Sequence, residues 1–243
     1  MTRPRERGAR LAGLIEAAGG EALRYPAIEI APPAETHELL RIVDALASFD
    51  LAIFVSPTAV RAAFGLLRSR SGWPPSVPVA AVGPGTRREL EKQGLRAVIA
   101  PASGGDSESL LAQPQLAAVG GRRVVIFRGA GGRELLGEAL AARGALLAYA
   151  ECYRRVRPQA ELAALTEEWR RGGVDAVTVF SAEALANLAD TLGSATIGGT
   201  PFFVSHRRIA EEALRRGIRA VTADGPGEDE MRARLVAYFG HAK

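Results

Sequence analysis

Short loops rich in Ser, Thr, Gly and Arg recur along the sequence, and each one leads into a helix-like segment. They are TRPRE, VSPTA, VGPGT, FRGAGGR, FSAE and VSHRR, and they include the hydroxyls of Ser56, Thr86 and Ser181. A helix N-terminus that follows a parallel strand offers unpaired N–H groups and a partial positive charge to an anion. Helix capping explains any one of these hydroxyls by itself. Their recurrence at equivalent places in the sequence favours a shared anion-binding surface.

Other residues that could bind a ligand or take part in catalysis give less specific signals. The turn GAGGR (129–133) is similar to a dinucleotide-binding fingerprint, but Glu134 occupies the place of its third glycine. His206 in a polar loop is either solvated or available for acid–base chemistry. Cys152 is expected to be a buried, inert thiol. Tyr153, in the segment ECYRR, either packs its ring or presents its hydroxyl as a weak acid.

Composition excludes several classes of protein. Apolar residues make up 47% and charged residues 24%, which is incompatible with a disordered chain. No apolar run reaches the roughly 18–20 residues of a membrane span, and the first residues lack the pattern of a secretory signal. The single cysteine allows no internal disulfide, and three histidines predict no metal cluster. The 31 basic residues are interspersed with 27 acidic ones, unlike the basic stripe of a nucleic-acid binder. We therefore expect a cytoplasmic protein that binds no nucleic acid, membrane or metal.

The sequence contains a tandem duplication of a unit of about 124 residues. The matched segments begin at Val77 and Thr200, at Asp50 and Asp175, and at Arg3 and Phe127, with offsets of 123, 125 and 124. The last offset places Met1 opposite Val125, inside an apolar run that is typical of a strand. We therefore expect a short, frayed first strand, or a natural start upstream of Met1.

Apolar runs bounded by Gly or Pro alternate with helix-period segments in both repeats. This alternation predicts an α/β fold with parallel sheets that helices cover on both faces. Each repeat could form its own domain, or the domains could exchange strands. The β-prone segments PAIEIAPP (26–33) and YAECYRRVRP (149–158) favour the exchange, because two extended crossings side by side would make a two-stranded hinge.

The order and spacing of several segments resemble those of the uroporphyrinogen-III synthase family. They are TRPRE, PAIEIAPP, DLAIFVSPTAVRA, VPVAAVGPGTRREL, FRGAGGREL, AECYRR and DAVTVFSAEALANL. The resemblance implies two similar domains, each a parallel five-stranded sheet of flavodoxin-like order flanked by helices, joined by a two-stranded β-ladder hinge. The expected boundaries are 1–29 with 158–243 for domain 1, 34–148 for domain 2, and 24–33 with 149–157 for the hinge strands.

The same resemblance implies a lyase without a cofactor. Such an enzyme binds hydroxymethylbilane, a linear tetrapyrrole with eight carboxylates, in an interdomain cleft. It expels the terminal hydroxyl as water, inverts the last pyrrole ring through a spiro intermediate and closes the macrocycle. The implied partners are this substrate and, transiently, the upstream bilane-forming enzyme, and we expect a monomer.

Matching motifs transfer family roles to individual residues. Tyr153 is implied to assist departure of the hydroxyl. The implied substrate contacts are Ser56, Thr86, Arg128, Gly129 and Ser181, with Arg3 a weaker candidate. The chain departs from the family where many members have a Gly-Pro-Thr-Thr turn, because it has Ser205-His206-Arg207-Arg208 there. Ser205 or an arginine would replace the threonine contact.

Two other functions remain open at this point. One is a two-domain α/β module that binds a small anionic ligand without chemistry. The other is a nucleotide-dependent enzyme, such as a dehydrogenase or glycosyltransferase, for which the turn GAGGR is the only indication.

Overall fold

The computed structural model describes residues 1–2, 8–70, 72–132, 134–158 and 162–240. The chain divides into two compact units, of which unit 1 comprises 1–30 with 156–243 and unit 2 comprises 31–155. The chain therefore passes between the units twice, once within strand β1 (Glu29–Ala31) and once within strand β6 (Leu146–Val156). That segments 24–33 and 149–157 act as a hinge stays a prediction.

Unit 2 is built on the strands of a six-stranded sheet in the order β1-β6-β5-β2-β3-β4. All pairs from β6 to β4 are parallel, and β1 lies beside β6 at the edge, so the sheet has six strands where five were expected. The remaining strands are β2 (Leu51–Phe54), β3 (Val79–Ala81), β4 (Val98–Ile99) and β5 (Arg123–Gly129).

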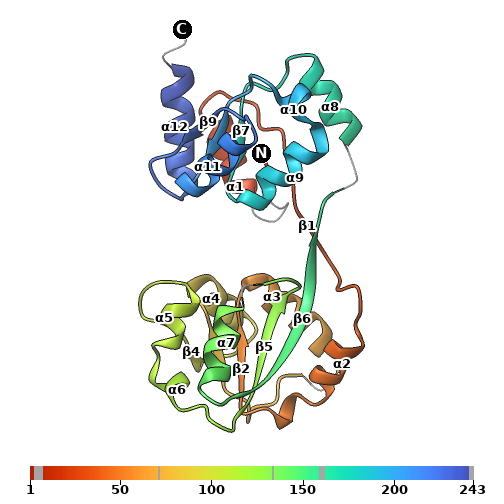
Figure 1. The fold of residues 1–243 in the computed structure, drawn as a ribbon, viewed down its shortest axis with the longest axis vertical. Helices are drawn as coiled ribbons and strands as arrows, with labels where there is room; N and C mark the ends of the chain where they lie inside the picture. Colours follow the sequence, from red (N-terminus) through yellow and green to blue (C-terminus); the bar gives the residue numbers. More distant parts are fainter. Residues whose placement is uncertain (3–7, 71, 133, 159–161, 241–243) are drawn as a thin grey trace. The chain divides into compact units, whose positions relative to one another are not determined.

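Helices cover both faces of this sheet (Figure 1), and a separate hydrophobic core lies on each face. Strand residues alternate between them: Ala52 and Phe54 belong to one core, Leu51 and Ile53 to the other. The first core contains buried residues of α2 (His37–Asp44), 3-10 helix η2 (Leu46–Ser48), α3 (Pro57–Leu67) and α4 (Pro84–Lys92). The second contains buried residues of α5 (Ser107–Leu111), α6 (Pro114–Ala117) and α7 (Leu135–Ala142). The expected helix-covered parallel sheet is thus confirmed for unit 2.

The strand order corrects the expectation of a flavodoxin-like sheet. Numbered along the chain from β2 to β6, the five parallel strands lie in the order 3-2-1-4-5, whereas the flavodoxin order is 2-1-3-4-5. Right-handed crossovers explain the arrangement. Helices α3 and α4 on one face carry the chain outward from β2 to β4, and α5 to α7 on the other face carry it back to β5 and onward to β6.

Within its described residues, unit 1 contains a three-stranded parallel sheet in the order β7-β8-β9, whereas five strands were expected. Its strands are β7 (Val177–Val179), β8 (Phe202–Val204) and β9 (Ala220–Thr222). Its helices are α1 (Ala9–Glu16), α8 (Leu162–Arg170), α9 (Ala182–Leu192), α10 (Ser194–Ile197), α11 (Arg207–Arg215) and α12 (Glu228–Gly240). Helices α8 to α11 contribute to the core on one face of the sheet, and α1 and α12 to the core on the other.

Two short segments continue the sheet of unit 1 beyond β7 without forming regular strands. The Thr2 N–H donates to Thr178 O at 3.3 Å, and the Tyr25 N–H donates to Met1 O at 2.9 Å. Met1 and Thr2 therefore lie between β7 and the segment 23–27, as β5 lies between β2 and β6 in unit 2. Only these two residues precede the undescribed stretch 3–7.

Among the described residues, every helix is too short or too polar to cross a bilayer.

Candidate functional site

The hydroxyls of Ser56 and Tyr153 meet in unit 2 at the carboxyl end of β2. Ser56 Oγ lies 3.2 Å from Tyr153 Oη, a hydrogen bond in which either atom could donate. Ser56 is also the N-cap of α3, because its Oγ accepts the Ala59 N–H at 3.1 Å and Pro57 occupies the first helical position. Ser56 can therefore cap the helix and also contact a ligand. The capping hydrogen bond holds its hydroxyl beside that of Tyr153.

A β-bulge aims Tyr153 at this position. Strands β5 and β6 pair Arg128 with Glu151 but Gly129 with Tyr153, so Cys152 is the extra residue. The ring of Tyr153 consequently packs on Gly129, and a Cβ at residue 129 would lie only 2.6 Å from Tyr153 Cζ. The Ala130 N–H donates to Tyr153 O at 2.8 Å and fixes the backbone beyond the bulge. Tyr153 is 4% exposed, so its ring packs in the core as well as presenting its hydroxyl to Ser56.

Arg128 is buried at the end of β5 and is held by three neighbours. Its Nη2 donates to Glu134 Oε1 at 2.8 Å, its Nε lies 3.5 Å from Glu151 Oε1, and its guanidinium stacks 4.7 Å from the centre of the Tyr149 ring. A hydrogen bond to Glu134 raises the pKa of Arg128 and lowers that of Glu134. Burial, followed by the charge of Glu134, raises the pKa of Tyr149. The site therefore holds the Arg128 guanidinium in a fixed position, with its charge paired to two partly exposed carboxylates.

Sequence reasoning did not find Glu134, Tyr149 and Glu151 as partners of Arg128. Glu134 is the residue at which the turn departs from a dinucleotide fingerprint, and here it pairs with Arg128. Tyr149 matches Tyr25 in the duplication but carried no chemical signal of its own. A Cβ at Gly137 of α7 would lie 1.8 Å from the Tyr149 hydroxyl, so this glycine allows the close approach of helix and tyrosine.

Helix α4 begins at the carboxyl end of β3 with an open N-terminus. Gly83 is its N-cap and provides no side-chain hydrogen bond, and Pro84 is its first residue. The next N–H groups, those of Gly85 and Thr86, are the ones that such a helix end offers to an anion. The Thr86 side chain is buried, so we expect its backbone rather than its hydroxyl to contact a ligand.

The candidates in unit 1 occupy equivalent strand ends. Ser181 follows β7 and caps α9 by accepting the Ala184 N–H at 3.1 Å, with φ −152° and ψ 148°, close to −157° and 156° at Ser56. Ser205 follows β8 and is buried, and its N–H donates to Val179 O at 3.2 Å. His206 is the N-cap of α11 but provides no side-chain cap. Arg3 lies outside the described residues.

The structure thus brings Ser56, Arg128, Gly129 and Tyr153 to one edge of unit 2, with the α4 terminus at the same edge, and places Ser181 and Ser205 in unit 1. Fold and site together define a duplicated α/β protein whose strand ends present hydroxyls, helix N-termini and a fixed arginine.

Comparisons with known proteins identify the family. The family model described as Uroporphyrinogen-III synthase HemD matches residues 9–233. The chain is 35% identical to the uroporphyrinogen-III synthase of Salmonella typhimurium over 77% of each sequence. It is also 35% identical to a putative uroporphyrinogen-III synthase of Methanothermobacter thermautotrophicus, over 99% of this chain and 98% of the relative. The chain belongs to the uroporphyrinogen-III synthase family.

Solved structures share the fold at low sequence identity. A mutant uroporphyrinogen III synthase of Thermus thermophilus matches with a TM-score of 0.63 and 20% identity, over 100% of this chain and 99% of that one. The uroporphyrinogen-III synthetase of Helicobacter pylori matches with a TM-score of 0.61 and 13% identity, over 90% of this chain and 96% of that one.

Proposed function

We propose that this protein is a uroporphyrinogen-III synthase that cyclises hydroxymethylbilane with loss of water and inversion of the terminal pyrrole ring. Membership of the family supports the reaction. The observation that carries the site is the hydrogen-bonded pair of Ser56 and Tyr153 at the N-terminus of α3. The reaction is a dehydration and rearrangement with no net oxidation, so its balance requires no redox cofactor.

In this proposal Tyr153 assists departure of the substrate hydroxyl. Ser56 Oγ accepts the Ala59 N–H, which leaves its own proton free for donation to Tyr153 Oη. Tyr153 then donates its proton to the leaving oxygen as the carbon–oxygen bond breaks, and the pyrrole nitrogen supplies the electron pair. The terminal pyrrole ring attacks the resulting azafulvenium carbon through its substituted α-carbon and forms the spiro bond. The bond from that α-carbon to the neighbouring methylene bridge then breaks, the ring turns over, and its free α-carbon bonds to this methylene. Loss of the proton from that carbon to the Tyr153 phenolate restores both the pyrrole and the phenol.

Positioning is the larger task, because the bilane loses its hydroxyl and closes unaided to the uninverted isomer. Holding the reacting ends in one geometry selects between the two products. We propose that the substrate carboxylates bind the open N-terminus of α4, the ends of α3 and α9, and Arg128. Ser181, Ser205 and Arg3 of unit 1 would contact the same substrate molecule as unit 2. The interdomain cleft thus remains part of the proposal, as do the hinge, the monomer and a transient contact with the bilane-forming enzyme.

The test is the isomer ratio of the product. Purified protein receives freshly generated hydroxymethylbilane, and the oxidised porphyrins are separated chromatographically. We expect the inverted isomer to predominate, and we expect Tyr153→Phe to lower kcat by about 10²-fold with the fold retained. An isomer ratio equal to that in buffer alone would leave a binding module as the better account. Stabilisation by NAD or a nucleoside diphosphate, but not by a uroporphyrin, would favour the nucleotide-dependent alternative.

A further inference from the structure

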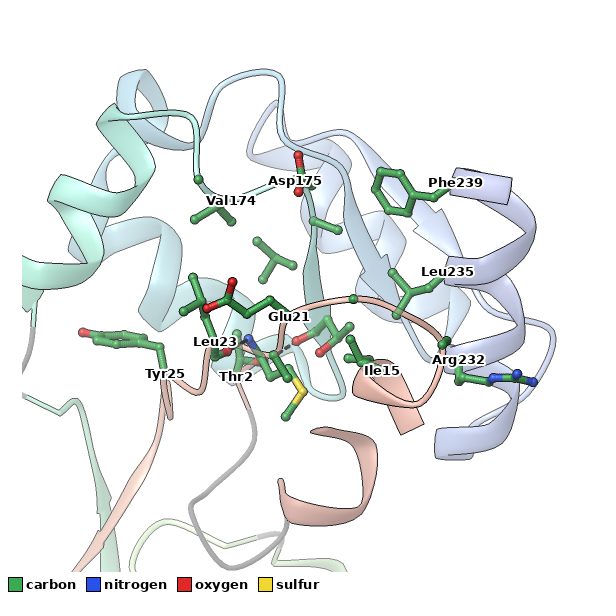
Figure 2. Close-up of a pocket in the computed structure, with 18 of the residues that line it drawn as sticks. Thr2, Ile15, Glu21, Leu23, Tyr25, Val174, Asp175, Arg232, Leu235 and Phe239 are labelled. Atoms are coloured by element: carbon green, nitrogen blue, oxygen red, sulfur yellow. Dashed lines mark hydrogen bonds between the residues drawn. The ribbon is translucent and has the colours of Figure 1, made fainter. Parts of the chain in front are cut away.

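The pocket of about 750 Å³ in unit 1 is poorly suited to an anion (Figure 2). Its lining includes the carboxylates of Glu21, Glu168 and Asp175, and Arg232 lies among them. Carboxylates repel a ligand of the same charge. An anionic ligand is better matched to Arg128 in unit 2, which is a buried cation at the end of β5.

Arg128 carries a buried donor that lacks an acceptor. Its side chain is 8% exposed, and its Nε makes no hydrogen bond with the residues that the structure describes. An unpaired buried donor is costly, because it has lost its hydration without gaining a protein acceptor. The guanidinium is nonetheless held in position by the hydrogen bond from Nη2 to Glu134 at 2.8 Å and by the Tyr149 ring. A ligand oxygen beside Nε would supply the missing acceptor.

The Glu151 carboxylate lies next to this donor without a hydrogen bond to it. Its Oε1 is 3.5 Å from Arg128 Nε, longer than the usual range of such bonds. Strand pairing places the two residues opposite each other, in the last pair before the bulge. The Glu151 side chain is 43% exposed, so it can turn into solvent without breaking a hydrogen bond to Arg128.

The charges around Arg128 require such a movement before an anion binds. One guanidinium faces the two carboxylates of Glu134 and Glu151, so the group has an excess of one negative charge. A ligand carboxylate that approached this group would be repelled as long as Glu151 stayed in place. Once Glu151 has turned away, the neutral pair of Arg128 and Glu134 remains, with the Nε donor still unpaired.

We propose that Glu151 is a specificity-determining residue, whose carboxylate occupies the place of a substrate carboxylate beside Arg128 in the free protein and is displaced by it. The inference rests on the proposed function, in which Arg128 binds a carboxylate of the bilane. The incoming oxygen accepts the Arg128 Nε–H, and Glu151 turns into solvent. An anion that forms no such hydrogen bond leaves Glu151 in place and is repelled by its charge.

The first test is the substitution Glu151→Gln, which keeps the size of the side chain and removes its charge. We expect KM for the bilane to fall by about three- to tenfold, with kcat changed less than about twofold, because the substrate no longer displaces a charged competitor. A residue that only held Arg128 in position would raise KM when substituted. Glu138→Gln removes an exposed carboxylate from α7 and is the matched control, for which we expect an unchanged KM.

The second test needs no turnover. In ¹⁵N-labelled protein the Arg128 Nε–H resonance is identified by its loss in Arg128→Lys. Sodium acetate, used as the carboxylate probe, should move this proton resonance downfield, because a charge-assisted hydrogen bond forms. The midpoint of the titration should fall at least about threefold in Glu151→Gln. Sodium chloride at the same ionic strength should leave the resonance in place.

A KM for Glu151→Gln equal to or above that of the wild type would overturn the proposal. So would an acetate midpoint that the substitution does not lower, or a shift of the same size with chloride. The proposed function fails separately. If the protein leaves the isomer ratio unchanged but Glu151→Gln lowers the acetate midpoint, the reaction is wrong and the exchange of carboxylates at Arg128 stands.

Discussion

The ring of Tyr153 packs against the backbone of Gly129. The β-bulge at Cys152 places these two residues opposite each other on strands β5 and β6. A Cβ at position 129 would lie 2.6 Å from Tyr153 Cζ and 3.0 Å from its Oη. The absence of a side chain at residue 129 thus allows the tyrosine hydroxyl to reach Ser56.

Gly129→Ala should therefore displace the Tyr153 ring. We expect kcat to fall at least roughly tenfold and the free energy of unfolding to fall by about 1–3 kcal/mol, because overpacking forces side chains and backbone to shift. Steady-state turnover and urea unfolding measure the two effects. Gly132→Ala in the same turn is the control, since its Cβ would meet Arg128 Nε at an ordinary 3.5 Å. Equal kcat values for the two variants would contradict the role of Gly129.

Ser56→Ala and Ser181→Ala remove equivalent helix caps from the two units. Each should lower the free energy of unfolding by about 1 kcal/mol. Only Ser56→Ala should lower kcat, because Ser56 alone of the two contacts Tyr153; Ser181→Ala should instead raise KM. In a Tyr153→Phe background, Ser56→Ala should change kcat less than about twofold if the two hydroxyls act as one unit. Additive effects on kcat would show that they act separately.

Glu134→Gln should alter the positioning of Arg128. The substitution keeps an oxygen acceptor near Nη2 but removes the charge that holds the guanidinium. We expect KM for the bilane to rise several-fold with kcat changed less than about twofold, because binding of substrate carboxylate is affected more than the chemical step. Glu138→Gln, one turn further along α7, removes the same charge and serves as the control. Equal KM values in both variants would remove Glu134 from this role.

Cys152 should make stability fall at alkaline pH. Burial raises the pKa of its thiol to about 12, whereas an unfolded cysteine ionises near pH 8.5. The native state therefore retains a proton that the unfolded state loses, and stability falls as pH rises above about 8.5, by up to about 1.4 kcal/mol per pH unit. Urea unfolding at pH 8 and pH 10 should show a larger loss for the wild type than for Cys152→Ala. The native thiol should also resist alkylation at pH 8, in contrast to the chain in denaturant.

Local chemistry and repetition explain what the sequence revealed. The burial of Cys152 and the capping positions of Ser56 and Ser181 follow from residue type and from the apolar run before each one. The alternation of apolar runs and helices likewise predicted the helix-covered parallel sheet of unit 2.

Features that depend on strand order and on contacts between distant segments could not be predicted from the sequence in the same way. The flavodoxin-like order failed because the same alternation of strands and helices is compatible with several strand orders. The contacts of Arg128 with Glu134, Tyr149 and Glu151 depend on pairing across β5 and β6 and on a bulge that leaves no periodic signal. The pairing of Gly137 with Tyr149 depends on how closely α7 approaches the sheet.

The division of the chain after residues 30 and 155 also determines which unit can fold first during synthesis. Every residue of unit 2 has left the ribosome soon after Arg155 is translated, so this unit can fold while the rest is still being made. The first thirty residues must wait for β7, β8 and β9, which are translated last. A nascent chain halted once Arg155 has cleared the ribosomal tunnel would therefore carry a folded unit 2 and an N-terminal segment without its partner strands.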